Sequence, residues 1–128
     1  MSKLKLSFGE IIILKPNLAE VIIDSDVVID LEMVDEFHEL LLTNLEQPFN
    51  LLINKVHQYS YTFEAQHQIG TLEQINLMAV VAYNSVTESS TACLLLIPRA
   101  IPWNMQVFKD RKSALNWLAS IEQQSEDL

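Results

Sequence analysis

The chain has 128 residues, of which 49% are hydrophobic and 20% are charged, a composition that favours one globular domain over a disordered segment. Its formal net charge of −9 disfavours nucleic acid and anionic membrane surfaces as partners. No segment has the roughly 18 consecutive apolar residues that a membrane-spanning helix needs, and the single cysteine, Cys93, excludes an internal disulfide. We therefore expect a soluble cytoplasmic protein without membrane insertion.

The first part of the chain has the pattern of strands joined by short turns. Residues 4–8 alternate between apolar and polar, as in a strand with one buried face. Ile11–Leu14 is continuously apolar, Pro16 breaks the run as a turn residue does, and Ala19–Ile23 resumes it. These segments predict an antiparallel hairpin that leaves through the loop Asp24–Asp26.

The first helix is predicted between Asp30 and Pro48. Asp30 can accept hydrogen bonds from the free amides of the first turn, and the acidic residues that follow favour the positive end of the helix dipole. One apolar face contains the residues Val34, Phe37, Leu41 and Leu45. His38 follows Phe37 and is expected to be exposed.

Two apolar segments, Leu51–Val56 and Met78–Tyr83, are predicted to form the buried parallel centre of a sheet. Between them we expect a polar and aromatic loop over residues 57–62 and a helix from near Phe63 to Gly70, a residue suited to a left-handed cap. The capping-box spacing of Thr71 and Gln74 predicts a further helical turn.

The last third of the chain repeats the alternation of helix and strand. Ser85 and Glu88 have capping-box spacing, which predicts a helix that runs to about Ile97. A short strand, Met105–Phe108, precedes a final helix that begins after Asp110. The residues expected to face inward on this helix are Ala114, Trp117, Leu118 and Ile121. Residues 123–128 are polar, and we expect them to form a frayed tail of a single domain over residues 1–128.

The sequence contains no motif for catalysis or for cofactor binding. No predicted strand ends in a glycine-rich phosphate loop, and His57 and His67 lie ten residues apart without the further ligands that a metal site needs. Cys93 has no base at a suitable spacing and is expected to be a small buried hydrophobe. Ser89, Ser90 and Thr91 are expected to allow close packing of the third helix. We therefore expect no enzyme activity, no cofactor and no metal.

The order of the elements resembles that of the STAS domain, in its SpoIIAA-like branch, the fold of bacterial anti-sigma factor antagonists. The segments that carry this resemblance are Leu18–Ile23 with Asp30–Phe37, the strands Leu51–Val56 and Met78–Tyr83, and Ile101–Phe108 with Ala114–Leu118. The resemblance implies an α/β fold with a mixed sheet of four to five strands and helices packed on it. It also implies a non-enzymatic domain that acts through protein contacts.

In STAS antagonists a serine at the start of the second helix is the regulatory switch, usually within Asp-Ser-Ser-Gly. The corresponding region of this chain is residues 58–63, where Ser60 and Thr62 are the nearest hydroxyl groups. Because the motif is missing, we expect no efficient phosphorylation at either residue, although both are the candidate regulatory positions.

A candidate interface follows the third helix. Leu95 and Leu96 belong to an apolar run that covers more than one helix face, and Ile101 and Trp103 follow shortly after. Either these residues contact a protein partner, which includes the second copy of a homodimer, or the loop before the last strand covers them. The alternative function is the binding of a small apolar, lipid-like ligand, because SpoIIAA-like domains are similar in layout to SEC14-like lipid carriers.

Overall fold

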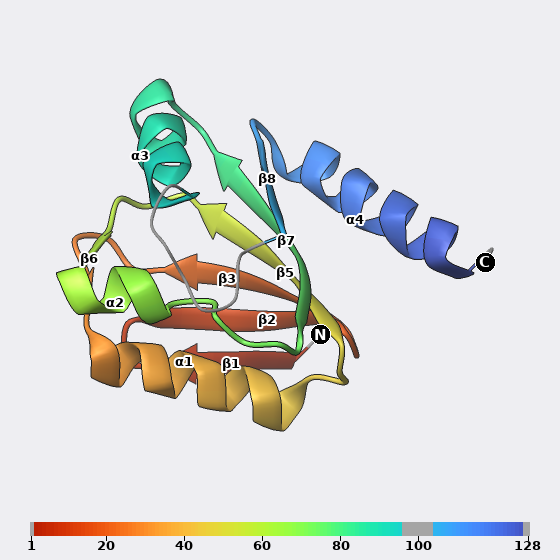
Figure 1. The fold of residues 1–128 in the computed structure, drawn as a ribbon, viewed down its shortest axis with the longest axis horizontal. Coiled ribbons are helices and arrows are strands. Elements are labelled where there is room, and N and C mark those ends of the chain that lie inside the picture. Colours follow the sequence, from red (N-terminus) through yellow and green to blue (C-terminus); the bar gives the residue numbers. More distant parts are fainter. Residues whose placement is uncertain (1, 96–103, 127–128) are drawn as a thin grey trace.

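The computed structural model describes residues 2–95 and 104–126, the side chains of residues 94–95 and 122–126 excepted. It is an α/β fold with a six-stranded mixed sheet, a two-stranded ladder and four helices (Figure 1). The strands of the sheet, in spatial order, are β1 (Ser2–Leu6), β2 (Gly9–Lys15), β3 (Leu18–Ile23), β5 (Phe49–Lys55), β7 (Ile75–Ala82) and β8 (Met105–Phe108). The ladder pairs β4 (Val28–Ile29) with β6 (Ser60–Tyr61), and the helices are α1 (Leu31–Asn44), α2 (Phe63–Gln68), α3 (Ser85–Leu95) and α4 (Arg111–Glu126).

The predicted hairpin and the predicted parallel centre are both confirmed. Strands β1, β2 and β3 are antiparallel, and Ile11 lies opposite Val21. Strands β3, β5, β7 and β8 are parallel, with Leu52 opposite Ala79 at the centre. The expected count of four to five strands was wrong, because β1 and β8 each pair over their own whole length with a neighbouring strand and extend the sheet at both edges.

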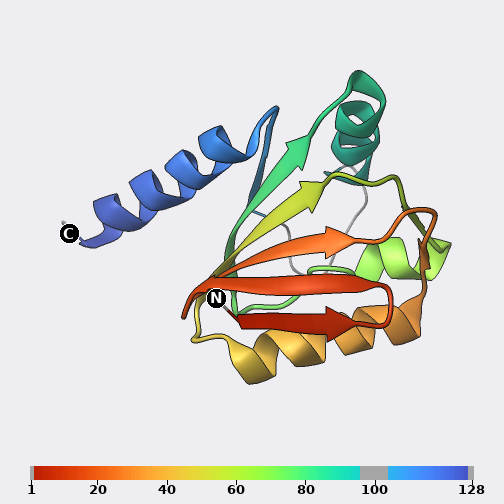
Figure 2. The same cartoon turned by 180° about the vertical axis from the view of Figure 1, so that it is seen from behind.

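The two faces of the sheet are covered unequally. Side chains alternate along a strand, so Leu51 of β5 points to one face and Leu52 to the other. Helices α1 and α2 pack on the Leu51 face, and Thr91 places α3 there as well, whereas Ala114 and Leu118 of α4 pack on the Leu52 face. Figure 2 shows the sheet from behind. Helices α1 and α2 lie behind the sheet in this view, and α4 (blue) lies on the left, next to β8. The larger core therefore lies under α1, α2 and α3.

At two of the helix starts, the local sequence was sufficient to predict the capping residue. Asp30 caps α1 by accepting a hydrogen bond from the Met33 N–H at 3.0 Å, as predicted. Asp110 likewise accepts from the Ser113 N–H at 2.7 Å. The third helix is capped by Asn84, which accepts from the Thr87 N–H at 2.8 Å, so the prediction of Ser85 was wrong by one residue.

The chain between α2 and β7 corrects two further expectations. Thr71 starts no helical turn, because its hydroxyl donates back to the Gln68 carbonyl at 2.8 Å. Residues 73–74 form a turn, in which the Ile75 N–H donates to the Leu72 carbonyl at 3.1 Å. The loop predicted over residues 57–62 contains β6, whose pairing with β4 no local pattern indicates. Gly70 has a φ of 71°, the left-handed conformation that was expected of it.

Trp117 is only half-buried, and its ring packs on Phe108 with the ring centroids 5.5 Å apart. Among the described side chains of α4, the fully buried ones are Ala114 and Leu118. We therefore expect Trp117→Ala to lower the free energy of unfolding by about 1–2 kcal/mol, less than the 3–5 kcal/mol typical of a fully buried indole. Denaturant unfolding measures this difference, and a loss above about 3 kcal/mol would identify Trp117 as the main anchor of α4.

None of the helices in the described part of the chain combines the length and the apolar character needed to cross a membrane.

Candidate functional site

A small apolar cavity lies between the sheet and the three helices on its larger face. Its volume is about 40 Å³. The apolar walls come mainly from β3, β5 and β7 and include Val21, Leu51, Ile53, Met78 and Val80. The polar side chains in its wall are Lys55, Tyr59, Tyr61 and Thr91. A charged amine at the border of such a cavity is the most unusual feature of the molecule.

Strand periodicity determines the position of Lys55. It is the last residue of β5, two residues after Ile53 and four after Leu51, so its side chain leaves the strand on the same buried face. The Lys55 Nζ donates a hydrogen bond to Thr91 Oγ1 at 2.9 Å, and Thr91 in turn donates to the Thr87 carbonyl at 2.8 Å. The ammonium also lies 5.5 Å from the centroid of the Tyr59 ring, within the range of a cation–π contact.

Burial changes the electrostatics of this group. Loss of solvent lowers the pKa of Lys55 to about 8, and no carboxylate of the described residues lies within ion-pair distance to oppose that shift. Burial, with a smaller contribution from neighbouring Tyr61, raises the pKa of the Tyr59 phenol well above 10, so this hydroxyl stays neutral. At pH 7 roughly nine in ten Lys55 side chains remain protonated, so the site holds a positive charge.

A cleft of about 190 Å³ opens next to the cavity, and Lys55 and Tyr59 belong to the walls of both. Its remaining lining residues are His57, Gln58, Val86, Thr87 and Ser90. The cleft therefore lies where β5 and β7 end, between the loop after β5 and the first turns of α3. Ligands of open α/β sheets commonly bind beyond the carboxyl ends of the strands. The cavity and the cleft together form the candidate site, which we call the Lys55 site.

His38 closes another side of the same face and corrects a prediction. It was expected to be exposed, but it is half-buried and its Nε2 accepts a hydrogen bond from the Gly70 N–H at 3.0 Å. Burial lowers the pKa of His38, partly offset by Asp35, which favours the neutral ring that this hydrogen bond requires. The contact fastens the end of α2 to α1, and Gly70 is part of the cavity wall.

The residues predicted as regulatory positions lie beside the Lys55 site without entering it. Ser60 is exposed in β6, one residue after Tyr59, and its N–H donates to the Val27 carbonyl at 2.9 Å. Thr62 caps α2 by accepting from the Ala65 N–H at 3.2 Å. The Thr62 hydroxyl therefore has a structural role in starting the helix.

The predicted interface cannot be placed in the same way. Leu96, Ile101 and Trp103 lie outside the described residues, and Leu95 is the last residue of α3, its side chain outside the description. Cys93 is exposed, so the expectation of a buried thiol was wrong. Among the α3 residues expected to allow close packing, Thr91 is buried, whereas Ser89 and Ser90 are exposed.

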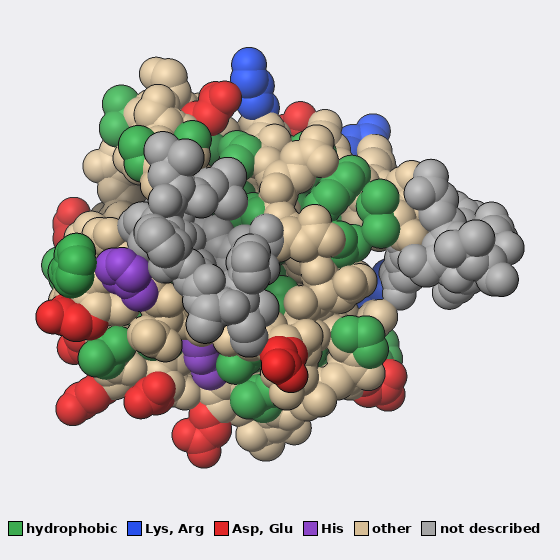
Figure 3. All heavy atoms as spheres, in the orientation of Figure 1, with side chains coloured by type: hydrophobic (Ala, Val, Ile, Leu, Met, Phe, Trp, Pro, Cys, Tyr) green, Lys and Arg blue, Asp and Glu red, His purple; other side chains and the backbone are tan. Residues whose placement is uncertain are grey.

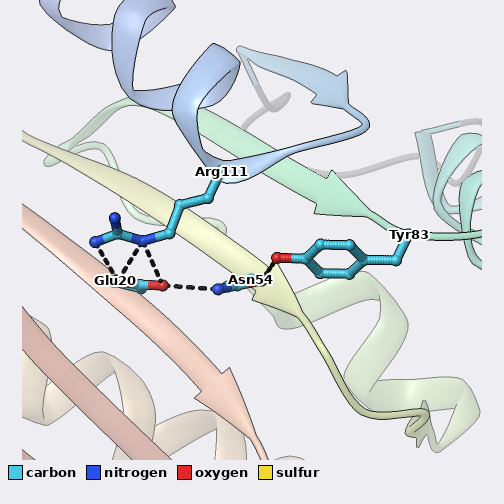
Figure 4. A network of polar contacts seen from close by, with 4 residues as sticks. All are labelled: Glu20, Asn54, Tyr83 and Arg111. Atoms are coloured by element: carbon cyan, nitrogen blue, oxygen red, sulfur yellow. Dashed lines mark hydrogen bonds and ion pairs between the residues drawn. The ribbon is translucent and has the colours of Figure 1, made fainter.

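A second polar cluster lies on the opposite face of the sheet (Figure 4). The Glu20 carboxylate accepts from Arg111 Nε and Nη2 at 2.9–3.1 Å and from Asn54 Nδ2 at 2.8 Å. The Tyr83 hydroxyl donates to Asn54 Oδ1 at 2.7 Å. These contacts join β3, β5, the residue after β7 and the first residue of α4. Because every partner is satisfied within the cluster, it is suited to fastening α4 rather than to binding a ligand.

Sequence reasoning missed Lys55 and Tyr59, although one signal for Lys55 was present. In β5, residues 49, 51, 53 and 55 share a face, and the first three are apolar. A lysine that continues a buried apolar row is uncommon, because few lysines are buried unless paired. Tyr59 carries no comparable signal, since its position depends on the pairing of β4 with β6.

Among the described residues, no three His, Cys, Asp or Glu side chains converge in a way that could hold a metal ion. Comparison of the chain with protein-family models, with curated proteins and with solved structures gives no match.

Proposed function

We propose that the protein is a non-enzymatic binding domain with a STAS-like fold, and that it holds a small, largely apolar ligand at the Lys55 site. The observation that carries this proposal is the apolar cavity beside a solvent-facing cleft at the carboxyl ends of the parallel strands. Apolar walls with a few convergent polar groups are the usual composition of small-molecule sites. The mixed sheet with a parallel centre supports the STAS-like fold as the scaffold.

The dimensions of the site limit the ligand. A cavity of 40 Å³ has room for about two or three water-sized groups, and drug-sized ligands occupy pockets of ~300 Å³ or more. The bound molecule must therefore place a short apolar segment in the cavity and its remaining atoms in the cleft of about 190 Å³. A complete membrane lipid is too large for this space.

A protein-interaction domain of the STAS type, as a homodimer or with a different partner, is the second candidate. Several large apolar side chains are exposed in the segments that follow β3, β5 and β7 in the sequence. These residues are Val28, Leu31, Val56, Phe63, Tyr83 and Val86. Phe63 is 74% exposed and Val86 67% exposed, which favours contact with another macromolecule at this end of the sheet. A domain that acts only through protein contacts is not expected to bind a small alcohol in its core.

Titration with 1-butanol, observed by NMR of the backbone amides, tests the proposed function. We expect saturable shifts that concentrate on residues lining the cavity, such as Leu51 and Val80. Val80→Leu should weaken binding because the larger side chain fills the cavity. The matched control is Val81→Leu, which adds the same methylene group on the opposite face of β7 and should leave binding unchanged. An absence of saturable shifts, or an equal effect of the two variants, would contradict the proposal.

A further inference from the structure

We infer that the Lys55 site selects a short-chain monocarboxylate, whose carboxylate pairs with the Lys55 ammonium while its alkyl chain enters the apolar cavity. The inference rests on the proposed function and adds the chemical class of the ligand. It is carried by three features of the described residues: the charges in the walls of the site, the free donors of Lys55, and the position of Lys55 between apolar and polar surroundings.

The described walls of the site contain positive charge without negative charge. The chain carries 17 Asp and Glu residues, yet none is among the described residues that line the cavity or the cleft. The titratable groups that face Lys55 from the neighbouring elements are Tyr59 and Tyr61 in the cavity and His57 in the cleft. Lys55 is partly buried, and a cation in such a position is usually paired, because an unpaired charge loses its hydration without compensation. The missing partner is therefore an anion that the described residues do not supply, such as a bound ligand.

Lys55 also has the hydrogen-bonding capacity to hold such an anion. An ammonium group has three N–H donors, and Thr91 is the one acceptor that the described residues provide. A carboxylate can accept from the remaining donors, and hydrogen bonds between charged groups are shorter and stronger than neutral ones. A single ammonium balances a single negative charge, which favours a monocarboxylate over a phosphate dianion.

The position of Lys55 orients the ligand. The lining of the cavity is mostly apolar, including Ile53 and Val80, whereas the lining of the cleft includes the polar residues Gln58 and Ser90. A molecule with an acidic end and an apolar chain can satisfy both sides only if the acidic end lies at Lys55. Because the cavity is about 40 Å³, the chain that enters it must be short.

The net charge of −9 repels an anionic ligand, and this repulsion must be compared with the attraction of the Lys55 ammonium. Figure 3 shows that the acidic side chains gather on the left and lower rim, where α2 and α1 lie. Salt screens interactions between exposed charges beyond ~8 Å at physiological ionic strength, whereas a contact pair at Lys55 is partly buried and is screened much less. The local pair therefore prevails over the distant charges.

Isothermal titration with butyrate, 1-butanol and butyl phosphate tests this inference on the whole chain. We expect butyrate to bind wild-type protein at least ~10-fold more tightly than 1-butanol, the ratio for one charge-assisted hydrogen bond. Lys55→Met should abolish this preference and retain binding of 1-butanol. The control Lys112→Met removes the same charge from an exposed position in α4 and should keep the preference. A carbon-13 NMR titration of the Lys55 side chain should also show that butyrate raises its pKa.

Each other result has a distinct meaning. Equal binding of butyrate and 1-butanol would overturn the acidic ligand and leave the proposed function standing. Tighter binding of butyl phosphate than of butyrate would overturn the carboxylate class. Binding of neither butyrate nor 1-butanol would overturn both the inference and the proposed function. A butyrate preference that survives in Lys55→Met would show that the carboxylate binds elsewhere.

Discussion

Replacement of Lys55 by methionine should raise the free energy of unfolding at pH 7 by about 2 kcal/mol. The folded state lowers the pKa of Lys55 from 10.5 to about 8 by burial, which corresponds to a destabilisation of about 3 kcal/mol when the group is charged. Methionine fills a similar volume without charge, and loss of the hydrogen bond to Thr91 offsets about 1 kcal/mol of the gain. Thr91 keeps its hydrogen bond to the Thr87 carbonyl.

The same shift determines how wild-type stability depends on pH. Between pH 8 and 10.5 the unfolded chain retains the Lys55 proton that the folded chain has released. The unfolded state then binds more protons, so the contribution of Lys55 to stability rises with pH in this window and is constant below it. Tyr59 has the opposite effect above pH 10, where its raised pKa keeps it protonated only in the folded state. The rise attributable to Lys55 is therefore best measured from pH 8 to 10.

Denaturant unfolding of wild type, Lys55→Met and the exposed control Lys112→Met at pH 7, 8, 9 and 10 checks both statements. Lys55→Met should be more stable than wild type at pH 7, with a difference that shrinks toward pH 10. Lys112→Met should follow the wild-type curve. A destabilised Lys55→Met at pH 7 would mean that the ammonium has a strong partner in the folded chain. If stabilisation and loss of the butyrate preference occur together, the charge is retained for binding at the expense of stability.

Removal of the Arg111 side chain should have an effect of similar size and opposite sign. We expect Arg111→Ala to lower the free energy of unfolding by about 2–3 kcal/mol. The Glu20 side chain is only 5% exposed, and without Arg111 its carboxylate would keep one amide donor, from Asn54. Breaking a buried ion pair commonly costs ~3–5 kcal/mol. The loss expected for Arg111→Ala is smaller because the Arg111 side chain is 44% exposed and solvent screens its charge.

A double-mutant cycle separates this pair from other effects of the substitution. In a Glu20→Gln background, Arg111→Ala should cost at least ~1 kcal/mol less than in wild type, because no buried charge is left unpaired. Lys112→Ala, the next residue of α4, should change the free energy of unfolding by less than ~0.5 kcal/mol. Equal effects of Arg111→Ala in the two backgrounds would show that the ion pair does not fasten α4 to the sheet.

The amino-acid sequence determined most of the local structure. Asp30 and Asp110 cap their helices as their positions predict, because a cap depends on one side chain and the amides two or three residues later. The hairpin of β2 and β3 and the central strands β5 and β7 follow from apolar periodicity and turn residues. These patterns act over a few residues, so they can be interpreted before any tertiary contact is known.

Only the tertiary structure decided which distant residues meet. Arg111 reaches Glu20 across 91 residues, and Gly70 donates to His38 across 32. The walls of the Lys55 site come from three strands and from elements that follow them, so its charge and volume depend on strand order and helix placement. The packing of whole sheet and helix faces against each other determines that order. A local sequence pattern does not indicate which residue lies across the core. The sequence therefore determined that Lys55 continues a buried row, while the fold decided that no carboxylate of the described residues lies beside it.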